Sequence, residues 1–352
     1  MNFKTLLVNG DYVKKLFVYL LVLAVILLCS CKTISDSPSV NETSSQESTV
    51  ESITESETES VVESKNESVV PPPEAQTPIK APQNVQSGKQ IVVNDALKGE
   101  QYAHNLESLQ TILDNHKYNI SLCVYSVDGS KSLSYNTDTG IFGACTVKAA
   151  YTLYACKQME NGNGNLNVPI TYEQKHYEPG TGDMQYSPFD TVFTMETALN
   201  KSMSISDNVG YLMAVDYFGR DGYNAYMREL GCDSLQIKPT VWSLRTKADD
   251  LVKIWCEIYN YFGTDTEYAR FLKTSCTNTA GNYATESLDG VEYSHKQGHN
   301  STGDWLSFSD AGIVWKGDVA YIIAIITDAP GPNSYSKGEF AKIIDIVHNK
   351  LF

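Results

Sequence analysis

An acidic segment near the N-terminus limits how much of this chain of 352 residues can fold. Residues 33 to about 70 consist almost entirely of Ser, Thr, Glu, Val and Asn. Residues 36–74 contain ten acidic residues and one base, Lys65, and so contribute most of the formal net charge of −15. A segment of this composition cannot bury enough apolar surface to offset its ordering entropy. We therefore predict a disordered tether over residues 32–95 and a folded domain over residues 96–352.

The first residues have the features of an export signal. Three lysines precede an apolar run over residues 16–28, which is short for a membrane span. The run ends in Leu28-Cys29-Ser30-Cys31, which resembles the lipobox of bacterial lipoproteins, where a Leu stands three residues before an acylated Cys. This resemblance implies a lipoprotein signal peptide over residues 1–31, a lipid on Cys31 and an extracytoplasmic domain anchored to a bacterial membrane. A plain secretory signal or an uncleaved anchor stays open, and either also places the domain outside the cytoplasm.

Charge and cysteine usage restrict the other partners. Outside the acidic segment the chain is only mildly acidic, so we expect no nucleic-acid partner. Six cysteines fall in the predicted domain: Cys123, Cys145, Cys156, Cys232, Cys256 and Cys276. An exported protein can pair some of them, but the pairing does not follow from spacing. No Cys-x-x-Cys motif or Cys/His cluster indicates a metal site, and no cofactor is expected.

The hydrophobic pattern predicts an α+β domain. Alternating or continuous apolar runs typical of strands cover residues 118–127, 132–136, 293–297, 307–314 and 319–328. Helical patterns cover residues 97–116, 145–161, 195–204, 221–230, 246–262 and 337–351. This order predicts a largely antiparallel sheet flanked by helices, with an inserted all-helical lobe at about residues 145–245.

The most informative stretch is the predicted helix start at Gly143. Cys145 and Lys148 are three residues apart and share one face of its first turn. A thiol at the positive end of a helix and beside an ammonium favours the thiolate, which is the reactive form. On spacing alone, a small buried Cys and a surface Lys are the more ordinary explanation.

Two further short motifs follow in order, Ser206-Asp207-Asn208 near a helix end and Lys296-Gln297-Gly298 on a strand. With Cys145-x-x-Lys148, they resemble the S-x-x-K, S-D-N and K-T-G set of the serine β-lactamase and penicillin-binding protein superfamily, and class A β-lactamases most closely. The resemblance covers about residues 100–352. One tripeptide alone would mean little, but three in order with matching helix and strand contexts predict this fold.

The resemblance implies catalytic roles for four residues. Cys145 would attack an acyl carbonyl and hold a covalent acyl-enzyme, and Lys148 would accept or hold its proton. Ser206 would relay a proton to the leaving amine, and Lys296 would supply positive potential. The ordinary alternatives are a helix-capping hydroxyl for Ser206 and a surface lysine on a strand for Lys296.

The resemblance also implies how a substrate is held. Asn208 would bind the amide side chain of the substrate, while Gln297 and Gly298 would line the strand beside it. The backbone N–H of Cys145 and one N–H of the strand would form the oxyanion hole.

Three departures from the family pattern bear on activity. The nucleophile is Cys145, and a thiolate is a competent acyl nucleophile, although a site built for a hydroxyl can misplace the larger sulfur. Residues 231–245, where class A enzymes carry their general-base Glu, contain no Glu, and Asp233 is the only acid. Gln297 replaces the Thr of the third motif with a longer amide. Without a base to activate water, an acyl-enzyme would persist.

Three functions remain open from the sequence. The first is an exported acyl hydrolase or transferase that acts through Cys145 on a peptide-like amide, such as cell-wall peptide, or on a β-lactam. The second is a catalytically impaired module that binds cell-wall peptide or another ligand, and the third is a structural surface lipoprotein. We favour the enzyme, because a scaffold alone needs none of Lys148, Ser206, Asn208 and Lys296. Efficient β-lactam hydrolysis is the least expected enzymatic activity.

Overall fold

The computed structural model describes residues 78–80, 82, 87–238, 245–317 and 319–352. The predicted signal peptide, the lipidation site Cys31 and most of the predicted tether lie outside these residues, so they stay predictions. Within the described part of the chain, no helix has the length and apolar content needed to cross a membrane.

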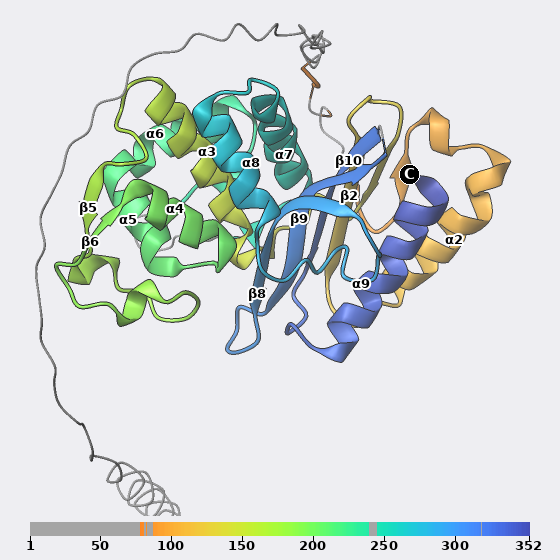
Figure 1. Cartoon of the computed structure of the whole chain (residues 1–352). Coiled ribbons are helices and arrows are strands. Elements are labelled where there is room, and N and C mark those ends of the chain that lie inside the picture. Colours follow the sequence, from red (N-terminus) through yellow and green to blue (C-terminus); the bar gives the residue numbers. More distant parts are fainter. Residues whose placement is uncertain (1–77, 81, 83–86, 239–244, 318) are drawn as a thin grey trace, which may run out of the picture. The chain divides into compact units, whose positions relative to one another are not determined.

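A six-stranded antiparallel sheet organises the described domain, with the strand order β1-β3-β2-β10-β9-β8 (Figure 1). The strands are β1 (Val92–Val93), β2 (Ile120–Ser126), β3 (Ser132–Tyr135), β8 (Glu292–Asn300), β9 (Ser307–Lys316) and β10 (Val319–Thr327). β8 lies at the edge of the sheet, so one side of its backbone is left for other contacts. The predicted strands all correspond to strands of this sheet, with ends that differ by a few residues.

Both faces of the sheet are buried, which explains why β10 reads as a continuous apolar run. Ile323 faces a core shared with α2 (Glu100–Asp114) and α9 (Ser334–Ile346), while Ile322 faces a second core. The second core includes α7 (Ala248–Phe262) and the helical lobe. Figure 1 shows α2 and α9 on one side of the sheet and the lobe on the other. The predicted α+β class is therefore confirmed.

The helical lobe is built around one central helix. Its helices are α3 (Val147–Glu160), α4 (Met195–Ser204), α5 (Asn208–Phe218) and α6 (Arg220–Glu229), and α8 (Glu267–Thr277) packs beside α3. The sequence suggests one apolar face for α3, but every residue from Val147 to Cys156 is buried. A helix that is covered on all sides loses the amphipathic pattern of a surface helix.

The lobe is not all-helical, which corrects the prediction. β5 (Pro169–Thr171) and β6 (Val192–Thr194) pair as a short antiparallel ribbon within it. Strands of three residues are too short to show an alternating pattern, so this loop-rich segment gave no strand signal. A second strand pair joins β4 (Ile141–Phe142) and β7 (Arg245–Thr246). In the chain, β4 comes just before the turn that contains Cys145, and β7 comes just before α7.

Ordered contacts begin before the predicted domain boundary at residue 96. β1 lies inside the predicted tether and pairs with β3. The backbone of Ile79 exchanges two hydrogen bonds with the side chain of Asn260, at 2.8 and 2.9 Å. Backbone pairing of this kind needs no apolar pattern, which is why composition placed the boundary too late.

Candidate active site

The turn that contains Cys145 is strained and tightly packed. Cys145 lies in a 3₁₀ turn, η2 (Ala144–Thr146), immediately before α3, and its side chain is 7% exposed. Ala144 has φ +47°, a left-handed conformation that is costly for a residue with a Cβ. Thr146 closes the turn by donating its hydroxyl to the carbonyl of Gly143 at 2.9 Å. The turn thereby fixes Cys145 at the start of the helix.

Two fully buried lysines meet at Ser206. Lys148 Nζ donates to the carbonyl oxygen of Ser206 at 2.6 Å and to Asn208 Oδ1 at 2.7 Å. Lys296 Nζ donates to Ser206 Oγ at 2.6 Å. The ordinary alternatives fail here, since neither lysine is at the surface and the N-cap of α5 is Asp207 rather than Ser206.

The two lysines set the ionisation of Cys145. Burial by itself raises the pKa of this thiol, but the positive charges of Lys148 and then Lys296 act in the opposite direction. Hydrogen bonds from Ser206 and Lys148 add to their effect, so the pKa of Cys145 lies below its ordinary value. Burial also lowers the pKa of both lysines, and that of Lys296 falls to about 7 despite the opposing charge of Cys145.

The Ser206 loop is held from several sides. Ser206 itself has φ +61°, a second left-handed residue at the site. Asp207 is fully buried and accepts from the backbone N–H groups of Gly210 and Met184, each at 2.9 Å. The hydroxyl of Thr181 donates to the Ser206 carbonyl at 2.6 Å. These hydrogen bonds hold the loop in place and maintain the left-handed conformation of Ser206.

The edge strand β8 packs directly against the turn that contains Cys145. At Gly298, a Cβ would lie 2.2 Å from the carbonyl oxygen of Gly143 and 2.8 Å from the backbone nitrogen of Cys145. Both are backbone atoms that cannot move aside, so only glycine fits. The Gln297 side chain turns back to accept from Lys296 Nζ at 3.0 Å. Neither Gln297 nor Gly298 is among the residues that line the cavity described next.

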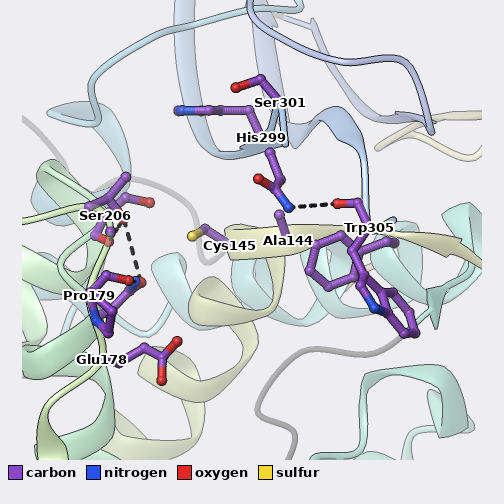
Figure 2. Close-up of a pocket in the computed structure, with 13 residues that line it drawn as sticks. Ala144, Cys145, Glu178, Pro179, Ser206, His299, Ser301 and Trp305 are labelled. Carbon is purple, nitrogen blue, oxygen red and sulfur yellow. Dashed lines mark hydrogen bonds between the residues drawn. The ribbon is translucent and has the colours of Figure 1, made fainter. Parts of the chain in front are cut away.

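A cavity of about 590 Å³ opens on Cys145. Besides Cys145, it is lined by Ser206 and Asn208 from the predicted set. Figure 2 shows the Cys145 sulfur pointing toward Ser206, with Pro179 on the same side and Trp305 on the opposite side. The structure thus brings all three predicted motifs together, with the Cys145 thiol facing the cavity and the amino groups of Lys148 and Lys296 meeting at Ser206.

Sequence reasoning missed several residues of the cavity. Glu178 and Thr181 come from the loop after β5, and His299 and Trp305 come from the end of β8 and the loop beyond it. His299 Nδ1 lies 2.9 Å from the hydroxyl of Tyr283, and burial followed by the charge of Lys296 lowers the pKa of His299. These residues lie near the motifs in space, so no spacing rule in the sequence singled them out.

The cysteines and possible metal ligands complete the description. All six cysteines of the described domain are free thiols, so Cys145 is not tied up in a disulfide. In the ranges that the structure covers, no group of three or more His, Cys, Asp and Glu side chains is arranged to hold a metal ion.

Comparison with known families places this site in context. A family model described as "Beta-lactamase enzyme family" matches residues 106–351. The chain belongs to the beta-lactamase enzyme family. A second model, described as "Treponema clustered lipoprotein", matches residues 13–197, so the chain is also a member of that lipoprotein family. No curated protein sequence gives a significant match.

Solved structures share the fold at low identity. PBP-A is 19% identical with a TM-score of 0.64, and the match covers 70% of this chain and 95% of that chain. A β-lactamase from Chitinophaga pinensis is 19% identical with a TM-score of 0.63, over 70% and 98%. A class A β-lactamase representative from Bacteroides cellulosilyticus is 17% identical with a TM-score of 0.61, over 72% and 99%. Such similarity establishes the α+β fold of this chain and leaves its chemistry to its own residues.

Proposed function

We propose that this chain is an exported, lipid-anchored acyl hydrolase or transferase that acts on a peptide-like amide or a β-lactam through an acyl-enzyme on Cys145. The observation that carries the proposal is the Cys145 thiol, which faces the cavity while Lys148 and Lys296 lower its pKa. Membership of the lipoprotein family supports a lipid on Cys31 and a position outside the cytoplasm at a bacterial membrane.

In the proposed reaction, the Cys145 thiolate attacks the carbonyl carbon of the substrate and forms a C–S bond. The C–N bond of the amide then breaks, which leaves a thioester on Cys145. Lys148 holds the thiol proton and positions the Ser206 carbonyl. As the C–N bond breaks, the Ser206 hydroxyl passes its proton to the leaving amine, and Lys296, whose Nζ donates to Ser206 Oγ at 2.6 Å, replaces that proton. Asn208 lines the cavity where it can meet the amide of the substrate.

Release of the acyl group is the slow step in this proposal. Residues 231–245 contain no Glu, and Asp233 is exposed and accepts from Gln236 rather than lining the cavity. Among the described residues that line the cavity, Glu178 is the one carboxylate. This shortage of bases favours a long-lived thioester over efficient β-lactam hydrolysis, and it also favours the second candidate, a module that binds peptide without turnover.

Mass spectrometry of the purified protein separates these functions. After exposure to a penicillin and to a panel of acyl-peptides, we expect a mass increase on the Cys145 peptide that is absent in Cys145→Ala. Cys145→Ser is the companion variant, because acylation of the introduced hydroxyl would show that the remaining cleft is competent. No adduct and no turnover with any compound, in a folded protein, would contradict the enzymatic proposal and favour the binding module.

A further inference from the structure

A second cavity adjoins the first. It has a volume of about 420 Å³ and shares Phe142 and Trp305 with the cavity that opens on Cys145. The two shared rings contact each other edge to face, with centroids 5.4 Å apart. The aromatic pair therefore lies at the boundary between the two cavities.

One cation is anchored at the shared wall. The Arg245 guanidinium lies 5.5 Å from the ring centroid of Trp305, and its Nη1 donates to the carbonyl of Gly140 at 3.4 Å. Stacking on an aromatic ring orients a guanidinium and leaves most of its donors available. Because those donors form a planar fork, they fit a carboxylate in a bidentate geometry.

The charge around the second cavity is unbalanced. Lys89, Lys117 and Arg245 line it, and within the described residues none of the three forms an ion pair with a carboxylate. Asp328 also lines it, but its two oxygens accept from the backbone N–H and side-chain amide of Asn119 at 2.8 and 2.7 Å. Asp304 is the second acid of the wall and is exposed. The three cations are exposed as well. Among the described residues of the wall, three cations against two acids leave one excess positive charge, which makes an anion the complementary ligand.

We propose that this second cavity is a subsite for a carboxylate carried by the same peptide ligand whose amide reaches Cys145. The inference rests on the proposed function, because it is the peptide-like ligand of the first cavity that would extend past Phe142 and Trp305. Arg245 binds the carboxylate at the shared wall, and Lys117, which also lines the cavity, supplies a second charge. The subsite selects acidic peptides over neutral ones of the same shape.

Pairs of fluorescent peptide amides test the subsite. The two peptides of a pair are identical except for Glu or Gln at one position, and this position is varied along the peptide to find the one that reaches the second cavity. Their dissociation constants are measured by anisotropy on Cys145→Ala, which cannot be acylated. We expect the best Glu peptide to bind about tenfold more tightly than its Gln partner, as for a hydrogen bond to a charged group. In Arg245→Gln and in Lys117→Gln the ratio falls toward one, while the Gln peptide binds as before.

Lys342→Gln is the matched control, because Lys342 is an exposed lysine that lines neither cavity, and it should keep the full ratio. Equal binding of Glu and Gln peptides at every position, or a ratio that survives both variants, would overturn the subsite. A site for small free carboxylates would instead bind glutarate as tightly as the Glu peptide, and that result also overturns the proposal.

Acylation of wild-type Cys145 by thioesters of the same peptides keeps the two proposals apart. A Glu preference in binding without any acylation leaves the subsite standing and contradicts the proposed enzymatic function. Acylation with equal binding of the two peptides contradicts the subsite alone.

Discussion

Two cysteines of the same helical segment show how this fold treats a thiol. Cys145 and Cys156 are eleven residues apart and both are buried. Burial raises the pKa of Cys156 well above its ordinary value, and the nearby charges of Cys276 and Glu160 add to the effect. Burial raises the pKa of Cys145 too, but there Lys148 and Lys296 reverse the outcome. The pKa values of these two buried thiols therefore shift in opposite directions because buried cations lie near Cys145.

A buried acidic cluster elsewhere in the domain makes the same point in reverse. Asp249 and Asp250 lie at the start of α7 with Lys253, whose Nζ is 3.0 Å from Asp250 Oδ1. Burial, followed by the charge of Asp250, raises the pKa of Asp249. In that cluster the cation is paired with carboxylates, whereas Lys148 Nζ donates to Ser206 and Asn208, and Lys296 Nζ donates to Ser206 and Gln297. The charges of both lysines lower the pKa of the Cys145 thiol.

Alkylation selectivity is the largest expected consequence of the contrast. With limiting iodoacetamide at pH 7, the native protein should be modified at Cys145 at least about a hundredfold faster than at Cys156 or the other buried thiols, because only a thiolate reacts. Peptide mapping by mass spectrometry measures each site. Comparable labelling of Cys145 and Cys156 in the folded protein would contradict the difference in ionisation between the two thiols.

Removing one cation should bring Cys145 closer to Cys156. In Lys148→Met the opposing effect of burial remains, so the pKa of the thiol rises and the thiolate fraction at pH 7 falls. We expect labelling at pH 7 to drop about tenfold or more, one pKa unit being a factor of ten, with recovery as the pH is raised. Lys157→Met on the same helix is the control, and its labelling rate should match the wild type. An unchanged pH profile in Lys148→Met would contradict the role given to Lys148.

The sequence predicted the motifs of this site better than its surroundings. The spacing of Cys145 and Lys148 placed both at one helix start, and the later motifs indicated the strand and loop that meet there. The sequence predicted that Lys148 and the helix start lower the pKa of Cys145. It did not predict the contribution of Lys296, which is distant in sequence and reaches the thiol only through the folded sheet. Glu178 and Trp305 escaped prediction because loops carry no periodic pattern that records which cavity they line.

Changing Cys156 tests the structural side of the comparison. In Cys156→Ser a hydroxyl replaces a thiol in an apolar core, and an unpaired buried polar group costs about 1–3 kcal/mol. Chemical denaturation should show that loss in the free energy of unfolding, while the rate of Cys145 alkylation in the native state stays the same. A change in Cys145 reactivity as large as that in Lys148→Met would show that the two ends of α3 are coupled.

Glu178→Gln should have the smallest effect. Glu178 is the one carboxylate among the described residues that line the first cavity, and its charge favours the protonated form of Lys148. Removing it takes a negative charge away from the region of the thiolate, so we expect alkylation of Cys145 at pH 7 to rise by about twofold at most. A decrease of tenfold would instead assign Glu178 a direct role in activating the thiol.

Direct titration of Cys145 tests the central claim. In a variant with the other five domain cysteines and Cys29 and Cys31 replaced by Ala, thiolate absorbance measured against pH reports this one group. The pH of half-ionisation should lie below that of a free thiol, and it should rise when Lys148→Met is added. A midpoint above that of a free thiol in the folded protein would mean that burial outweighs the lysines, and Cys145 would then be an ordinary core cysteine.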